Sequence, residues 1–315
     1  MFTIEEDSFG SFTQMELKNV LTGESVSIIH DFGTAINALT LQSNGRNYQL
    51  LRGAALSKEM VGQRWYKGVK LSPFPNRVRD GKYTFQGKEY QLPINEEARH
   101  NALHGFVYNK PFELIGHVEG HTEASVEFEY NYNGKVEGYP FPFRLSLTYI
   151  LSEEGLECST TVLNTGKEAM PIGDGWHPYF KTGTSVDKLH LLLPPGDLIE
   201  VDERLNPSGK KSPFSKFNQL TVIGDHQFDT GFALKIVDDI ATTQLYDPQQ
   251  NLTISLWQET GPSKYNFLQV YIPPDRQSIA IEPMTCSADA FNNGDGLIVL
   301  QPGEHFNAKY GVTLR

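Results

Sequence analysis

The chain has 315 residues, of which 39% are hydrophobic and 21% charged, and its formal net charge at pH 7 is −11. This composition excludes a disordered chain, because it supplies enough apolar side chains to form a core. The negative charge, with no run of Lys or Arg, argues against nucleic acid and anionic membranes as partners and suits a neutral small-molecule ligand.

The cysteines and the N-terminal segment indicate where the protein works. Cys158 and Cys286 form no Cys-x-x-Cys pair and have no metal-ligand spacing, so we expect two free thiols in a reducing compartment. The first residues, Met-Phe-Thr-Ile-Glu-Glu-Asp, lack the basic and apolar regions of a signal peptide. No window holds the roughly 18 apolar residues of a membrane span. These features predict a cytoplasmic protein.

The predicted elements are nearly all strands. Helical periodicity is limited to a possible short helix at 57–67 and one turn at 96–103. Further along, apolar and polar residues alternate with a period of two, which predicts strands with one buried face, in 126–132, 156–162 and 252–256. Turn-forming residues separate these runs at Asn133-Gly134, Glu154-Gly155, Asn164-Thr165-Gly166 and Asp247-Pro248. This pattern is typical of an all-β, antiparallel β-sandwich.

The chain contains no internal repeat, no low-complexity tract and no linker. We therefore expect residues 1–315 to form a single domain, a size that all-β sandwiches reach. The segment 202–217 is rich in Pro, Ser, Gly and Lys and is predicted to be a surface loop.

Several familiar catalytic motifs are missing from the sequence. It has no Gly-x-Ser-x-Gly elbow, no P-loop and no Gly-x-Gly-x-x-Gly. This argues against a serine hydrolase of the elbow type, a P-loop nucleotidase and a dinucleotide enzyme. His117 and His121 have a spacing that would suit a metal on a helix, but Val-Glu-Gly between them predicts a hairpin, so we expect exposed histidines and no metal site.

Two segments in the first half could carry chemistry. Arg77, in Pro-Phe-Pro-Asn-Arg, could donate two hydrogen bonds to a hydroxyl or an oxyanion, or could form a surface salt bridge. His104 precedes Gly105, which lets a backbone approach closely and leaves the imidazole accessible. The alternative for His104 is a hydrogen-bonded structural histidine.

Two further segments lie in the second half. His177 follows Trp176 and is close to Tyr179, and aromatic faces of this kind stack on sugars or simply fill a core. Glu282 shares a strand face with small residues and is followed by proline, which suits the floor of a ligand site or an ordinary solvated strand. Gln269 lies between Phe267 and Tyr271 on its own strand face, as expected in a sugar site.

Taken in order, these segments resemble the aldose 1-epimerase (galactose mutarotase) family. The resemblance extends from the strand around residues 34–41 to residues 300–304. Its motifs are Asn76-Arg77, Leu103-His104-Gly105, His177-Pro178-Tyr179-Phe180, Phe228-Asp229, Leu268-Gln269-Val270-Tyr271 and Ile281-Glu282-Pro283. Each motif is weak alone, and six in order are a strong signal.

The resemblance implies a large β-supersandwich of the galactose mutarotase type and a reaction on free sugars with no cofactor and no metal. Glu282 matches the general base for the C1 hydroxyl, His177 the general acid for the ring oxygen, and His104 a second histidine that polarises the reacting oxygen. The positions expected to bind substrate are Arg77, Asp229, Gln269, Asn76, Trp176 and Tyr179. A monomer or a homodimer is expected.

Some positions depart from the family pattern and keep alternatives open. Well-known galactose mutarotases have Gly-Gly after the Leu-His pair and Ser or Thr before Tyr-Phe. This chain has Gly105-Phe106 and His177-Pro178 at these places, which indicates a divergent branch. The arginine typical of hexose-6-phosphate mutarotases is absent after Phe106, so an unphosphorylated hexose is favoured, although Lys110 leaves the phosphorylated one open. A non-catalytic carbohydrate-binding module and a glycoside-processing enzyme using Glu282 and Asp229 are the other hypotheses.

Overall fold

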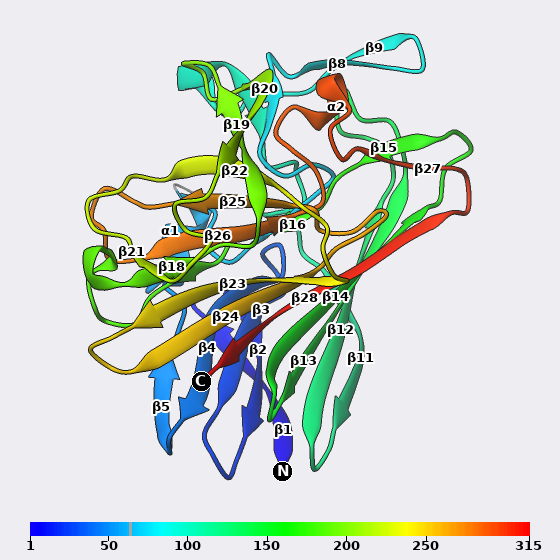
Figure 1. Cartoon of the computed structure of the whole chain (residues 1–315). Helices are drawn as coiled ribbons and strands as arrows, with labels where there is room; N and C mark the ends of the chain where they lie inside the picture. The colour runs from blue at the N-terminus through cyan, green and yellow to red at the C-terminus, as the bar shows by residue number, and fades with distance from the viewer. Residues whose placement is uncertain (63–64) are drawn as a thin grey trace.

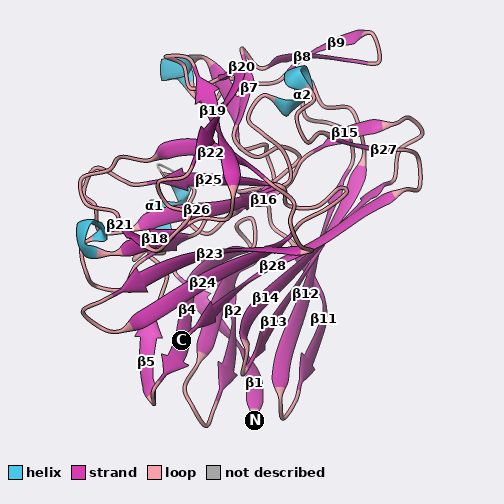
Figure 2. Cartoon of the chain, in the orientation of Figure 1, coloured by secondary structure: helices cyan, strands magenta, loops and turns pink. Residues whose placement is uncertain are grey.

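The computed structural model describes residues 1–62 and 65–315. Its strands form three large sheets and three two-stranded ones, and all pairs of named strands are antiparallel (Figure 1). Figure 2 shows that strands dominate and that helices are confined to single turns. The prediction of an all-β antiparallel architecture is therefore confirmed.

The sheets have the following strands. The five-stranded sheet contains β1 (Phe2–Phe9), β2 (Phe12–Asn19), β3 (Ser25–Ile29), β4 (Ala35–Ser43) and β5 (Arg46–Gln49). The nine-stranded sheet has the order β11 (Glu113–Glu119), β12 (Glu123–Tyr132), β13 (Phe143–Ser152), β14 (Gly155–Asn164), β28 (His305–Leu314), β24 (Leu252–Glu259), β23 (Ile240–Asp247), β18 (His190–Leu192), β21 (Thr221–Val222).

The eight-stranded sheet is the one that carries most of the candidate site residues. Its order is β20 (Pro207–Phe214), β19 (Gly196–Val201), β22 (Asp229–Leu234), β25 (Phe267–Tyr271), β26 (Ile279–Met284), β16 (Gly175–Trp176), β6 (Lys70–Leu71), with β17 (Tyr179–Phe180) also paired to β26. The small sheets are β7 (Arg77–Arg79) with β10 (Asn101–Leu103), β8 (Lys82–Phe85) with β9 (Lys88–Gln91), and β15 (Met170–Ile172) with β27 (Ile298–Leu300). The helical turns are α1 (Ser57–Val61), η1 (Glu97–Arg99), η2 (Val186–Lys188) and α2 (Ala290–Asn293).

Alternation along the strands builds the core. In β12 the side chains of Val126 and Phe128 are fully buried while the glutamates between and after them are partly exposed. One continuous apolar cluster joins the large sheets, for example through Leu17 of β2, Leu147 of β13 and Val270 of β25. Burial of one strand face in this shared cluster is the expected basis of a sandwich. The cysteines, as predicted, are free, and both are buried.

Two predicted segments differ from the structure. The helix expected at 57–67 is limited to α1, which ends before Gly62, and residues 63 and 64 lie outside the described part of the chain. The segment 202–217 was expected to be a loop, but it contains β20, an exposed strand at the edge of its sheet. Lysines and prolines are the side chains that protect such an edge, so the composition that indicated a loop reflects an edge strand.

Other predictions hold. The single turn expected at 96–103 is η1, followed by β10. His117 lies in β11 and His121 in the turn that follows, and both are exposed. Within residues 1–62 and 65–315, no helix is long and apolar enough to cross a membrane.

A buried ion pair ties the core to the segment that precedes His177. Lys70 Nζ lies 2.6 Å from Asp174 Oδ2, and both side chains are almost completely buried. The ammonium group also donates to Thr160 Oγ1 at 2.7 Å, and the hydroxyl of Tyr265 donates to Asp174 at 2.6 Å. Because a buried charge is tolerated only with such partners, the pair fixes the position of the 174–177 segment against β6.

Lys70→Met should lower the free energy of unfolding by about 3–5 kcal/mol, because it leaves the Asp174 carboxylate buried without its cation. Urea unfolding followed by tryptophan fluorescence measures the change. The control is Lys309→Met, which removes the partly exposed pair with Glu157 and should cost at most about 1 kcal/mol. The double variant Lys70→Met/Asp174→Leu should recover much of the loss, and equal losses in Lys70→Met and Lys309→Met would contradict the assignment.

Candidate active site

The side chains selected from the sequence converge on one cavity of about 320 Å³. Eight of the nine selected residues line it: Asn76, Arg77, His104, His177, Tyr179, Asp229, Gln269 and Glu282. A larger hollow of about 410 Å³ shares Trp65 and Tyr66 with this cavity, but its lining is mainly apolar and brings no carboxyl group and histidine together. The smaller cavity is therefore the candidate active site.

Glu282 forms the floor of the cavity. It lies in β26, directly opposite Gln269 of β25, and only 2% of it is exposed. Its Oε2 atom has no hydrogen-bond partner within the described residues. Burial, followed by repulsion from the nearby Asp229 carboxylate, raises the pKa of Glu282 well above its usual range. The residue is thus not a solvated strand glutamate but a carboxyl group withdrawn from water.

His177 is the partner of Glu282. Its Nε2 atom lies 3.5 Å from Glu282 Oε1, and its ring stacks on that of Tyr179 with centroids 4.9 Å apart. The main chain of His177 accepts a hydrogen bond from Gly68 N and donates one to Val69 O, which fixes the backbone that carries the ring. Burial lowers the pKa of His177 to about 3. The imidazole is therefore neutral near pH 7, and of the two residues Glu282 retains a proton more readily.

His104 meets the ring of His177 edge to face, with ring centroids 5.3 Å apart. Its Nδ1 atom accepts a hydrogen bond from the main-chain N–H of Asn76 at 3.1 Å. Burial, then the proximity of His177 and Arg77, lowers the pKa of His104 well below its usual value. Both histidines are consequently neutral in the physiological range.

A row of polar side chains crosses the cavity from Arg77 to Asp229. Arg77 donates to Asn76 Oδ1 at 3.1 Å, and Asn76 Nδ2 donates to Gln269 Oε1 at 3.3 Å. Gln269 Nε2 then donates to Asp229 Oδ1 at 3.0 Å. Each group in the row fixes the orientation of the next, so the amides cannot rotate independently. A row of oriented donors and acceptors suits a ligand with several hydroxyl groups.

The guanidinium of Arg77 is itself held by Glu96, a residue that the sequence did not single out. Arg77 Nε and a terminal nitrogen each lie 2.9 Å from one Glu96 oxygen, which is the two-bond geometry that arginine forms best. Hydrogen bonds with Arg77, despite burial of the carboxyl, lower the pKa of Glu96. Glu96 therefore remains ionised and keeps Arg77 in place.

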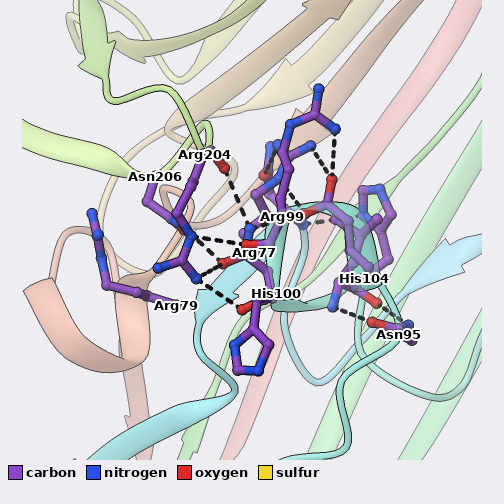
Figure 3. A network of polar contacts seen from close by, with 12 residues as sticks. Arg77, Arg79, Asn95, Arg99, His100, His104, Arg204 and Asn206 are labelled. Carbon is purple, nitrogen blue, oxygen red and sulfur yellow. Dashed lines mark hydrogen bonds and ion pairs between the residues drawn. The ribbon is translucent and has the colours of Figure 1, made fainter.

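Further polar contacts support the loop that carries Glu96 (Figure 3). Asn101 donates to Glu96 at 2.9 Å, and Arg204 binds the main-chain oxygens of Arg99 and His100, each at 2.9 Å. In Figure 3, Arg77 and Arg99 lie between Arg204 and His104. Because these partners come from segments about 100 residues apart, only the folded chain assembles this support.

Trp176 is the one selected residue that the structure does not bring into the cavity. It is 1% exposed, its indole N–H donates to Gly68 O at 3.0 Å, and its ring stacks on Tyr310. Successive residues of an extended chain point to opposite sides, so Trp176 enters the core while His177 reaches the cavity. The alternative of a core aromatic, left open by the sequence, describes Trp176.

The lining also includes aromatic residues that were not selected from the sequence. Trp65 stacks on Tyr271 with centroids 6.3 Å apart, and Tyr66 meets His104 edge to face at 4.6 Å. Trp65 and Tyr66 fall in the segment expected to be helical, which concealed them, whereas Tyr271 alternates with Gln269 and could have been included. Aromatic faces beside polar groups are typical of carbohydrate sites. The described residues contain no group of three or more His, Cys, Asp and Glu side chains placed to hold a metal ion.

The chain is similar in sequence to several known proteins. The sequence profile of the family described as Aldose 1-epimerase matches residues 14–313. The uncharacterized protein YihR of Escherichia coli K12 is 33% identical over 244 residues, which cover 75% of each chain. Galactose mutarotase of Homo sapiens is 27% identical over 190 residues, covering 59% of this chain and 54% of the human protein.

A solved structure has the same fold. A galactose mutarotase-like protein of Clostridium acetobutylicum superposes with a TM-score of 0.88 at 22% sequence identity, covering 100% of this chain and 98% of that chain. The chain therefore has the galactose mutarotase fold, as the sequence resemblance implied.

Glu282→Gln should make the fold more stable at pH 8 but not at pH 4. The raised pKa of Glu282 means that the folded state holds a proton that the unfolded chain releases at about pH 4.3. The free energy of unfolding of the wild type therefore falls by about 1.4 kcal/mol per pH unit between the two pKa values, whereas that of Glu282→Gln does not. Urea unfolding between pH 4 and 8 measures this. Glu113→Gln, at an exposed position of β11, is the control, and parallel pH profiles for wild type and Glu282→Gln would contradict the prediction.

Proposed function

The chain belongs to the aldose 1-epimerase family of isomerases, and from this premise we propose that it is a mutarotase that interconverts the α and β anomers of a free hexose. The observation that carries the proposal is the buried pair of His177 and Glu282, whose nearest atoms are 3.5 Å apart. The two oxygens that exchange protons in mutarotation, O1 and the ring oxygen O5, are bonded to the same carbon. A proton acceptor and a proton donor must therefore lie side by side, as these two residues do.

The resting pair needs only a proton shift to become reactive. Transfer of the proton from Glu282 to His177 produces a carboxylate and an imidazolium without any change in total charge. Sugar hydroxyls that donate to the carboxylate favour this form, because hydrogen bonds to a charged group offset its desolvation. The row from Arg77 to Asp229 supplies partners for the remaining hydroxyls.

The reaction then follows from the two roles. Glu282 removes the proton of the O1 hydroxyl while His177 protonates O5, so that the C1–O5 bond breaks and C1 becomes an aldehyde carbon. Rotation about C1–C2 presents the other face of the aldehyde. Closure reverses both proton transfers, and Glu282 and His177 return to their starting states. A positioned acid or base typically contributes roughly 10²–10⁴-fold to the rate.

The remaining features of the proposal concern substrate and organisation. The phosphorylated alternative requires a cation free to bind phosphate. Lys110 does not occur in the described lining, and the two arginines that do, Arg77 and Arg99, are both paired with Glu96. We therefore favour an unphosphorylated hexose as the substrate, and we assign the chain to a divergent branch of the family with His-Pro-Tyr-Phe at 177–180.

We also propose one domain for residues 1–315, since the apolar cluster joins all three large sheets.

Addition of the protein to freshly dissolved α-D-glucose or α-D-galactose should accelerate the change in optical rotation, and Glu282→Gln should lower kcat by roughly 10²–10⁴-fold because it removes the proton acceptor. The control Glu113→Gln should have wild-type kcat. No acceleration with any common aldose, together with sugar binding by calorimetry, would favour the non-catalytic module. Faster conversion of glucose 6-phosphate than of glucose would favour the phosphorylated alternative, and release of aryl groups from aryl glycosides the glycoside-processing one.

Arg77→Lys should raise KM roughly tenfold and change kcat less. Lysine keeps the charge but cannot bind both Glu96 oxygens and Asn76 at once, so the polar row loses its first member. Initial rates over a range of sugar concentrations separate the two parameters. Arg79→Lys is the matched control, because Arg79 lies two residues further along β7, pairs with Asp202 and does not line the cavity. Equal effects of both substitutions would argue against a role for Arg77 in binding.

A further inference from the structure

The hydrogen bonds around His104 determine which of its ring nitrogens carries the proton. The main-chain N–H of Asn76 donates to His104 Nδ1 at 3.1 Å. A main-chain N–H can only donate, so Nδ1 must be the acceptor and therefore unprotonated. The hydrogen of the neutral ring is then on Nε2, for which the described residues provide no hydrogen-bond partner. His104 thus presents an N–H group that is free to donate to a ligand oxygen.

The backbone on both sides of this hydrogen bond has an unusual conformation, and a second hydrogen bond runs in the opposite direction. Asn76 and His104 both have left-handed backbone conformations, with φ of 57° and 62°. The N–H of His104 donates to Asn76 O at 2.8 Å, so each residue receives a hydrogen bond from the other. A non-glycine residue in this conformation is strained, and asparagine tolerates it better than most residues. The strain is retained where the two loops meet, at the candidate site.

Close packing keeps the two loops in register. Gly105 has φ of 68°, and a Cβ atom at this position would lie 2.1 Å from Ser72 O. Ser72 O also accepts the main-chain N–H groups of Phe106 and Val107, at 3.0 and 3.2 Å. The segment after His104 is therefore fastened to the segment before Asn76, which leaves the imidazole little freedom to turn.

The side chain of Asn76 has a second and separate set of contacts. Its oxygen accepts from Arg77, and its nitrogen donates to Gln269, which in turn holds Asp229. One residue thus connects the histidine to the polar row: the main chain fixes the imidazole, and the side chain fixes the amide of Gln269.

We propose that Asn76 is a positioning residue whose main chain holds His104 as a neutral Nε2–H donor facing the cavity and whose side chain aligns the polar row. This rests on the proposed mutarotase function. His104 then donates a hydrogen bond to the sugar oxygen on which negative charge develops and so stabilises it. It does not exchange protons with the sugar. Burial keeps the ring neutral, and a neutral donor returns unchanged after each turnover.

Two substitutions separate the two roles of Asn76. Glycine adopts positive φ without strain and keeps the main-chain N–H, so Asn76→Gly removes only the side chain. Valine is disfavoured at positive φ, so Asn76→Val disturbs the main chain as well. We expect Asn76→Gly to act mainly on KM, by roughly tenfold, and Asn76→Val to lower kcat by a further factor of about 10² because the imidazole is no longer fixed.

The decisive readout is the ¹⁵N NMR spectrum of the histidine ring nitrogens, with His104 assigned by comparison with His104→Gln. In the wild type, Nδ1 should be unprotonated and Nε2 protonated, without change between about pH 5.5 and 8, because burial holds the pKa of His104 well below its usual value of about 6.5. Asn76→Gly should keep this pattern, and Asn76→Val should lose it. Asn44→Val is the matched control, since Asn44 also has positive φ but lies in the exposed turn between β4 and β5.

A protonated Nδ1 in the wild type would overturn the proposal, and so would an Asn76→Val variant that keeps both the wild-type spectrum and the wild-type kcat. If Asn76→Val does not fold, the wild-type spectrum alone decides the main-chain role. Asn76→Asp, which tolerates the backbone but cannot donate to Gln269, then tests the side-chain role beside Asn76→Gly. The spectrum needs no sugar. Failure of mutarotase activity and failure of the His104 assignment are therefore distinguished.

Discussion

Withdrawal of the Glu282 carboxyl from water is the constraint on which the arrangement of the cavity depends. The residue lies near the centre of the eight-stranded sheet, where its neighbour Ile281 belongs to the apolar core and Pro283 on its other side is buried. A carboxyl group in such a place resists ionisation, and it becomes reactive only through groups that can share its proton or its charge. In the proposed mechanism His177 supplies the first, and the hydroxyls of the sugar supply the second.

Other charged groups affect the pKa of Glu282 or hold its neighbours in place. Asp229 raises the pKa of Glu282 and Arg77 opposes it, so the two ends of the polar row act on the carboxyl in opposite directions. Glu96 offsets much of the charge of Arg77, and Arg204 holds the loop that carries Glu96. Beneath the cavity, the pair of Lys70 and Asp174 fixes the segment that leads to His177. Charged groups are thus arranged in layers, with each layer orienting the one nearer to the cavity.

Sequence predictions were correct where they depended on local patterns and wrong where contacts between distant segments decided the outcome. Alternation in 126–132 and 156–162 identified β12 and β14, because the period of two depends only on which side of one strand faces the core. The helix predicted at 57–67 was too long, because a local propensity cannot reveal that α1 ends at Val61 and that Trp65 and Tyr66 line the cavity. Trp176 was assigned to the ligand by its proximity to His177 in sequence, yet adjacent residues of a strand face opposite ways.

The all-β architecture, the motifs of the family and eight residues that line one cavity could be predicted from the sequence, because periodicity and motif order are properties of a one-dimensional pattern. The electrostatic state of these residues could not be predicted, because it depends on the folded structure. Burial of Glu282 and His177, the support of Arg77 by Glu96 and the hydrogen bond that fixes His104 all require segments distant in sequence to meet. The pKa of a carboxyl or an imidazole is set by what surrounds it in space, and that surrounding exists only after the sheets have packed.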